Sequence, residues 1–129
     1  MLALATPSAG LPAAPDIYPL ACAYAPRGGD LSPQGRCARL EDGVPRIDPA
    51  HLARMAFDRG LAEIRIISAG IAYARRDGHA AMVFILDNKG DAFAGGLVRG
   101  LRDGRLVYYD RRLRPRIVTA FDWGEPFRN

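Results

Sequence analysis

The chain is short of the residues on which most catalytic and metal sites are built. Its 129 residues include two cysteines and two histidines. His51 and His79 stand at no metal-ligand spacing from either cysteine, and the sequence has no second cysteine pair. It also lacks a glycine-rich phosphate loop, a Gly-x-Ser-x-Gly elbow and a zinc-binding His–Glu spacing. These absences predict a protein that is not an enzyme and needs neither a metal nor a cofactor. A hydrolase whose titratable groups converge in a deep pocket is the alternative.

Long apolar runs are absent too, and lysine is nearly so. No stretch approaches the ~18–20 residues that a membrane-spanning helix requires, so we expect no transmembrane segment. Lys89 is the single lysine among 18 basic residues, and the formal net charge is +4. A basic balance of this size permits binding to anionic partners without requiring it.

Residues 1–21 differ in composition from the rest of the chain. As far as Asp16 they are small, apolar and uncharged, which is typical of the end of a signal peptide. Small residues offer cleavage positions after Ala9 and after Ala14. A flexible tail of alanine and proline is the alternative interpretation.

The two cysteines favour export. Cys22 and Cys37 flank a stretch rich in turn residues, and a disulfide between them would close a loop of roughly 16 residues. Two separate buried thiols are the alternative. A bridge together with a cleaved leader would place the protein in the periplasm or outside the cell, and without them it would be cytoplasmic.

Proline and glycine are abundant, and this favours short elements joined by turns. The chain has 14 glycines and 10 prolines. One short helix is predicted near 48–57, where Asp48 can cap and Pro49 suits the first helical position. From residue 60 onward, alternating apolar residues and Asp-Gly turn pairs at 77–78 and 103–104 predict about seven strands. We therefore expect a mainly β protein with antiparallel strands.

The second half of the chain contains an internal repeat. Segments 60–93 and 96–127 present the same order of features, with Tyr73 matching Tyr108 at an offset of 35 residues and with Phe93 matching Phe127 at an offset of 34. A weaker earlier copy, with the helix inserted, precedes them. We expect two to three degenerate hairpin repeats of about 35 residues. They would make up one domain, 22–129, divided into segments 22–59, 60–95 and 96–129.

These units resemble the WG-repeat family of bacterial β-repeat proteins, which is named for a Trp-Gly pair. "GLAEIRI" and "GLVRGL" match the first strand of the family's unit, "GRLVYYDRRLRPRIV" matches its second strand, turn and third strand, and "AFDWGEPF" matches its closing element. Ile71-Ala72 and Leu106-Val107 stand where the signature pair belongs, so the repeats are degenerate. Trp123-Gly124 lies elsewhere in the unit. The resemblance covers about residues 57–127, and it implies twisted hairpins in an antiparallel sheet and a role in protein or ligand binding.

Ten side chains of the predicted strands are expected to stabilise the fold by burial. They are Ile64, Ile66, Tyr73, Val83, Ile85, Leu97, Leu106, Tyr108, Ile117 and Phe121.

Arginines gather in the turn after the second strand of each unit. With one tyrosine they form a candidate partner surface of Arg75, Arg76, Tyr109, Arg111, Arg112, Arg114 and Arg116. The main functional expectation is a non-enzymatic β module that binds an unknown protein partner, a ligand or an envelope component. An arginine row beside an exposed tyrosine can also bind phosphate or stack on a base. A binder of anionic polymer, whether nucleic acid, lipid or polysaccharide, is therefore the alternative. The structural interpretation is that these arginines guard a sheet edge against aggregation, and an unpaired edge would allow self-association.

Overall fold

Across residues 17–127 the chain folds into a curled antiparallel sheet with one short helix, which confirms the predicted mainly β class. The computed structural model describes residues 17–127, and the two predicted cleavage positions lie outside them. The described elements are β1 (Leu20–Tyr24), β2 (Ser32–Glu41), β3 (Val44–Ile47), α2 (Pro49–Leu52), β4 (Leu61–Ile66), β5 (Gly70–Arg75), β6 (Ala80–Val83), β7 (Ile85–Leu86), β8 (Lys89–Gly90), β9 (Val98–Arg102), β10 (Arg105–Tyr109) and β11 (Pro115–Val118).

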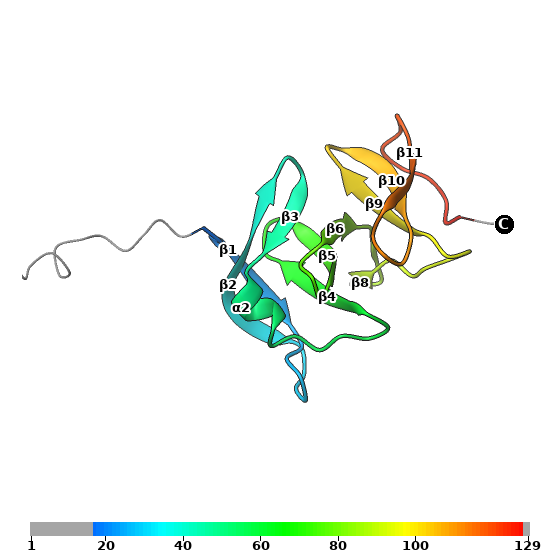
Figure 1. The fold of residues 1–129 in the computed structure, drawn as a ribbon. Coiled ribbons are helices and arrows are strands. Elements are labelled where there is room, and N and C mark those ends of the chain that lie inside the picture. Colours follow the sequence, from blue (N-terminus) through cyan, green and yellow to red (C-terminus); the bar gives the residue numbers. More distant parts are fainter. Residues whose placement is uncertain (1–16, 128–129) are drawn as a thin grey trace, which may run out of the picture.

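Three meanders of three strands each build the large sheet (Figure 1). Its strand order is β11-β10-β9-β6-β5-β4-β1-β2-β3, while β7 and β8 form a separate hairpin. The first two meanders are joined by pairing of β1 with β4, and the second and third by pairing of β6 with β9. β3 returns to contact β6, so the first six strands curl around a shared interior.

The helix α2 is a single turn, shorter than the predicted span of 48–57. Asp48 caps it as expected, because its Oδ1 accepts a hydrogen bond from the Ala50 N–H at 2.9 Å. Pro49 occupies the first turn, where its missing N–H costs nothing. Within residues 17–127, no helix is both long and apolar enough to span a membrane.

Two Asp-Gly turns shape the tips of long hairpins. At Asp42–Gly43 and at Asp103–Gly104 both residues have positive φ, as a two-residue type I′ turn requires. The two tips meet in space, because a Cβ built onto Gly43 would lie 2.8 Å from Asp103 Oδ1. Glycine at 43 therefore allows the β2–β3 hairpin to approach the β9–β10 hairpin.

Two hydrophobic cores lie on opposite faces of β5. Ala72 and Ala74 pack into the first core, while Ile71 and Tyr73 of the same strand pack into the second. The first core comprises Cys22, Tyr24, Cys37, Ala38, Ile47, Leu52, Met55, Ala62, Ile64, Ile66, Ala72, Ala74 and Ala80. The second comprises Leu61, Ile71, Ala81, Val83, Val98, Val107, Tyr109 and Leu113.

The aligned residues of the two predicted units make the same contact. The Tyr73 hydroxyl donates to the Asp91 carbonyl at 2.7 Å, and its ring stacks on Phe93. In the next unit the Tyr108 hydroxyl donates to the Glu125 carbonyl at 2.6 Å, and its ring meets Phe127 edge-on. In each unit the tyrosine ties the second strand to the segment that closes the unit.

Three of the ten expected core residues are exposed, and the prediction was wrong for them. Ile85 is 56% exposed because the apolar run 80–86 does not continue as one strand. At Phe84 the backbone turns away, and the chain enters the β7–β8 hairpin. Ile117 is 38% exposed on the edge strand β11, and Phe121 is 69% exposed in the segment that follows. Ile64, Ile66, Val83 and Leu106 are buried, while Tyr73, Leu97 and Tyr108 are half-buried.

A buried ion pair ties the third meander to the rest of the chain. Arg99 on β9 contacts Asp91 through two side-chain hydrogen bonds of 3.0 and 2.8 Å, and its side chain is 8% exposed. The remaining guanidinium nitrogen of Arg99 donates to the Gly124 carbonyl at 3.1 Å, and the guanidinium lies over Phe84. Removing either charge would leave its partner buried and unpaired, which is strongly destabilising.

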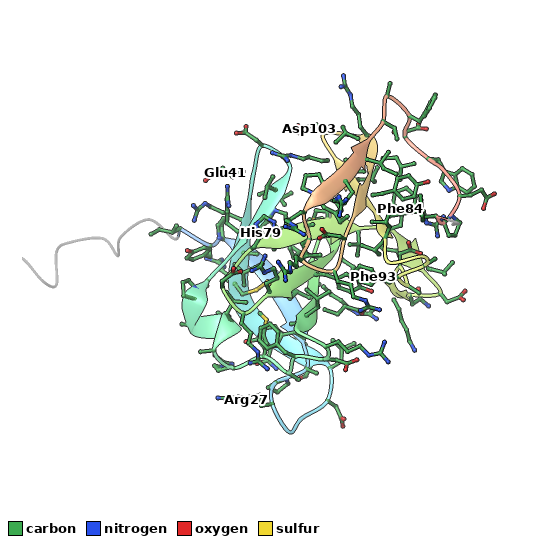
Figure 2. All side chains as sticks on the ribbon, turned by 45° about the vertical axis from the view of Figure 1, so that its right-hand side comes forward. Arg27, Glu41, His79, Phe84, Phe93 and Asp103 are labelled. Carbon is green, nitrogen blue, oxygen red and sulfur yellow. A yellow bond between two sulfur atoms is a disulfide. The ribbon has the colours of Figure 1, made fainter. Side chains whose placement is uncertain are left out.

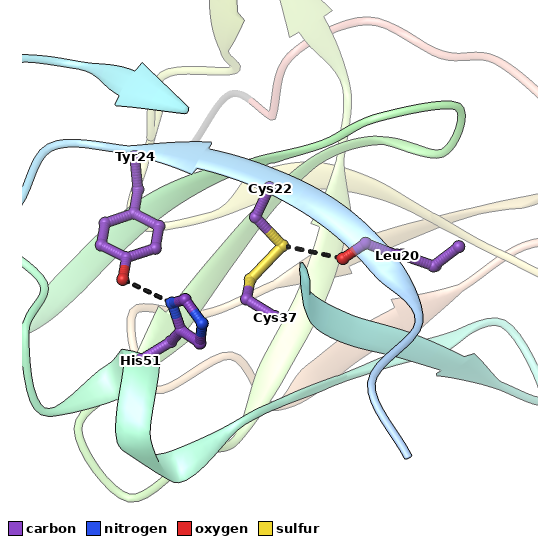
Figure 3. The surroundings of a disulfide bond; sticks show 5 residues. All are labelled: Leu20, Cys22, Tyr24, Cys37 and His51. Carbon is purple, nitrogen blue, oxygen red and sulfur yellow. Dashed lines mark hydrogen bonds between the residues drawn. A yellow bond between two sulfur atoms is a disulfide. The ribbon is translucent and has the colours of Figure 1, made fainter. Parts of the chain in front are cut away.

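The predicted disulfide is present between β1 and β2 (Figure 3). The Cα atoms of Cys22 and Cys37 lie 5.8 Å apart, and both side chains are buried in the first core. Beside the disulfide, the Tyr24 hydroxyl and His51 Nδ1 form a hydrogen bond of 2.7 Å, which joins β1 to α2. The bridge therefore holds β1 to β2 at the first core, and the hydrogen bond beside it attaches the helix to β1.

Breaking the bridge should destabilise the fold without changing its class. We expect Cys22→Ala/Cys37→Ala to lower the free energy of unfolding by about 3 kcal/mol, because the closed loop no longer restricts the unfolded chain. Urea unfolding followed by circular dichroism measures this loss. Reduction of the wild type should reproduce it, and an unchanged unfolding midpoint in both experiments would show that the bridge contributes nothing.

Candidate anion-binding cleft

A cleft of about 630 Å³ lies between the β2–β3 hairpin, α2 and the turn after β5. Arginines from three parts of the chain line it: Arg39 and Arg46 from the hairpin, Arg27 from the loop after β1, and Arg76 from the turn. We call this site the arginine cleft. Figure 2 labels two of the lining residues, Arg27 at the lower loop and His79 near the middle of the molecule.

The arginine pair of the hairpin follows from its register. Arg39 and Arg46 are directly opposite each other in the antiparallel ladder. Like charges in this position repel, so the pair needs a counter-charge. Glu41 supplies it: Oε2 accepts from Arg39 Nη2 at 3.1 Å, and Oε1 lies 3.5 Å from Arg46 Nε. One carboxylate thus serves two arginines.

The other two arginines of the cleft have no acidic partner among the described residues. The Arg76 guanidinium lies 4.4 Å from the ring centre of Phe57, a cation–π contact. Arg27 is tied to the fold through its backbone N–H, which donates to the Arg54 carbonyl at 2.9 Å. Both guanidinium groups are therefore available to an anion.

Among the described residues that line the arginine cleft there is one acid, Asp77, and it already has partners. Asp77 Oδ2 forms an ion pair of 2.9 Å with Arg75, which is not a lining residue. Its Oδ1 accepts a hydrogen bond from the His79 N–H at 3.0 Å. The cleft consequently combines two arginines that share Glu41, two arginines without an acidic partner among the described residues, and one lining acid that is paired with Arg75.

Apolar side chains form the floor of the cleft. They are Ile47, Leu52, Met55 and Phe57, of which the first three are buried and Phe57 is half-buried. Tyr18 stands at the rim, and the Arg39 guanidinium lies over its ring at 5.2 Å. A ligand in the cleft would meet charge at the rim and hydrocarbon beneath it.

The partner surface predicted from the sequence is divided in space. Of its residues, Arg76 alone lines the arginine cleft. Arg111 lies over Phe93 at 4.5 Å in a neighbouring cleft of about 500 Å³, with which the arginine cleft shares Phe57. Arg75 pairs with Asp77 and donates to the Arg112 carbonyl at 3.2 Å, which links the two arginine-rich turns.

The placement of Tyr109 on the partner surface was wrong. Tyr109 is 5% exposed and belongs to the second core, whereas Tyr108, predicted as core, is half-buried. Gly100 makes room for the Tyr109 ring, because a Cβ built there would lie 2.6 Å from Tyr109 Cε2. Alternation places the two tyrosines on opposite faces, and the contact with Glu125 fixes which of them faces the C-terminal segment.

Asp110 organises the remaining arginines of the predicted surface. Its Oδ1 accepts the backbone N–H groups of Arg112 and Arg114 at 2.9 and 3.0 Å, and its Oδ2 accepts Arg114 Nε at 3.0 Å. Arg116 Nη1 lies 3.6 Å from the same oxygen. Burial acts to raise the pKa of Asp110, but these hydrogen bonds outweigh burial and lower it. This turn therefore uses its arginines to satisfy a buried carboxylate.

The two histidines have structural contacts. His51 is half-buried beside Tyr24. His79 is exposed in its turn, and its Nε2 donates to the Leu113 carbonyl at 2.9 Å. Within residues 17–127, no three metal-ligating side chains gather.

Sequence reasoning missed Arg27, Arg39 and Arg46. A signal for the pair was present in the Asp42-Gly43 turn, since a two-residue hairpin places residues 39 and 46 opposite each other. The contribution of Arg27 depends on the long-range packing of the loop after β1, for which the sequence offers no local signal.

Comparison with known proteins leaves the family open. No family model matches the chain, and no curated protein or solved structure matches it significantly.

The contribution of Asp110 to stability should depend on pH in a defined direction. Because its pKa is lower in the folded state, the stabilisation is complete above the unfolded value of about 3.9 and is lost as the pH falls through the folded value. We expect Asp110→Ala to lower the free energy of unfolding by about 2 kcal/mol at neutral pH. Below the folded-state pKa of Asp110, the substitution should lower it by little. Urea unfolding of the wild type and of Asp110→Ala, from neutral pH down to a pH at which Asp110 is protonated, measures the difference.

Asp30→Ala, which removes an exposed carboxylate, is the control and should change stability little at any pH. A cost for Asp110→Ala that does not shrink in acid would contradict the assigned role of the charged carboxylate.

Proposed function

We propose that this chain is a non-enzymatic β module that binds an anionic partner, a protein or a smaller ligand, in the arginine cleft. The observation that carries the proposal is the convergence of four arginines around one cleft, in which the one acid among the described lining residues, Asp77, is paired with Arg75. Solvated arginines that serve only solubility have no need to gather from three separate parts of the chain.

The chemistry of the side chains supports an anion rather than a neutral ligand. A guanidinium presents five N–H donors in a planar fork that matches carboxylate and phosphate oxygens. Arg27 and Arg76 have no acidic partner among the described residues, so an incoming anion displaces no ion pair there. The apolar floor below them, with Leu52 and Met55, gives a ligand a hydrocarbon surface as well.

The arginine cleft is favoured over the turn at 111–116 as the main binding site. In that turn Asp110 already holds Arg114 and lies near Arg116. A polymer that bound there would have to compete with these contacts.

Export of the module is part of the proposal. The Cys22–Cys37 bridge supports it, since disulfides persist in oxidising compartments such as the periplasm and the cell exterior. The resemblance to WG-repeat proteins is a further part, and the shared tyrosine contacts of the two aligned units support it.

Binding should depend on the arginines of the cleft and not on net charge alone. The probes are three fluorescein-labelled anions: an alternating Glu-Ala dodecapeptide, a heparin dodecasaccharide and a thymidine dodecanucleotide. We expect at least one to bind, and Arg27→Ala and Arg76→Ala each to weaken it by about threefold to tenfold. Fluorescence anisotropy at physiological ionic strength gives the dissociation constants.

Lys89→Ala is the matched control, because it removes one positive charge from the exposed β8 strand, outside the cleft. It should leave binding within about twofold, since salt screens distant charges. The proposal fails if no probe binds the wild type, or if Lys89→Ala weakens binding as much as the cleft variants do. Thermal unfolding of each variant verifies that it is folded.

A further inference from the structure

The arginine pair of the β2–β3 hairpin already holds a carboxylate. Glu41 accepts from Arg39 at 3.3 Å from Nε and 3.1 Å from Nη2, and it lies 3.5 Å from Arg46 Nε. Glu41 and Arg46 are about half exposed, at 50% and 46%. An ion pair this open to water is weak, so a second carboxylate can compete for the same donors.

Glu41 does not use up the donors of the pair. Each guanidinium carries five N–H groups, and the contacts with Glu41 use Nε and Nη2 of Arg39 and Nε of Arg46. Without a carboxylate between them, the two arginines would face each other across the ladder as unscreened like charges. The pair therefore selects a carboxylate-like group, and the chain itself supplies one when no partner is bound.

The cationic groups are spread along the cleft rather than gathered at one point. In Figure 2, Glu41, His79 and Arg27 follow one another from the upper part of the molecule to its lower loop. The arginine pair comes from the hairpin that carries Glu41 and Arg27 comes from the lower loop, and all three arginines line one cleft. This spacing suits an extended ligand that carries several anionic groups, and a single small anion would contact one part only.

The aromatic rings favour a peptide over a nucleic acid. Proteins that bind single strands stack bases on open aromatic faces. At this cleft Arg39 already covers Tyr18, and Arg76 already covers Phe57. The floor of Leu52 and Met55 suits the apolar side chains that alternate with acidic ones in an extended peptide.

We infer that the arginine cleft binds an extended acidic segment of a partner protein, one of whose carboxylates replaces Glu41 between Arg39 and Arg46. The inference rests on the proposed function of the cleft and names its ligand. Glu41 then competes with the partner for the two arginines. This competition lowers the affinity of the cleft for weakly acidic segments more than its affinity for strongly acidic ones.

The test compares Glu41→Gln with the wild type, using the labelled Glu-Ala dodecapeptide and its Gln-Ala counterpart. We expect Glu41→Gln to bind the acidic peptide about threefold to tenfold more tightly. Glu125→Gln makes the same change in net charge in the C-terminal segment, away from the cleft, and should change affinity less than twofold. In an Arg39→Ala/Arg46→Ala background, the gain from Glu41→Gln should disappear.

Each arm of the experiment decides a different point. Equal affinity of Glu41→Gln and Glu125→Gln overturns the replacement of Glu41, and so does equal binding of the acidic and neutral peptides. Tighter binding of the thymidine dodecanucleotide or the heparin dodecasaccharide than of the acidic peptide overturns the assignment of a protein partner. The proposed function still stands if an anionic probe binds more tightly than the neutral peptide and Arg27→Ala weakens that binding. If no probe binds the wild type, the proposed function fails as well.

Discussion

Back-to-back packing on β5 is the constraint on which the rest of the structure depends. The strand carries alanines toward the first core and Ile71 and Tyr73 toward the second, so both of its faces pack against a core. Ala72 and Ala74 are fully buried, which leaves no volume for a larger side chain without displacing neighbours. The small residues let the first six strands curl tightly, and the larger ones anchor the third meander.

The arginine cleft is a consequence of that curl. To enclose the first core, the β2–β3 hairpin must return to β6, and this brings Arg39 and Arg46 beside the turn after β5. The turn contributes Arg76, and α2 closes the floor with Leu52. The disulfide fixes β2 against β1, and the Tyr24–His51 hydrogen bond fixes α2 to β1, so covalent and polar links support two walls of the cleft.

Local signals in the sequence predicted local features, and long-range packing determined the others. Alternation and Asp-Gly pairs predicted the strands from 61 onward, and cysteine spacing predicted the bridge. The arginine-rich turns stood out in the sequence, yet Asp110 uses much of that charge. The arginines of the cleft are separated along the chain and meet only when the sheet curls. Tyr108 resembles Tyr73 in its contact, and both are half-buried although the alternating pattern predicted them as core.

The most direct test of the account is a nuclear magnetic resonance titration that follows the Nε–Hε signals of the arginines while the acidic dodecapeptide is added. Binding in the arginine cleft predicts that the signals of Arg27, Arg39, Arg46 and Arg76 shift together along one saturation curve, while that of Arg114 beside Asp110 stays in place. Saturable shifts confined to residues 111–116 would contradict it, and so would small shifts spread over all the arginines.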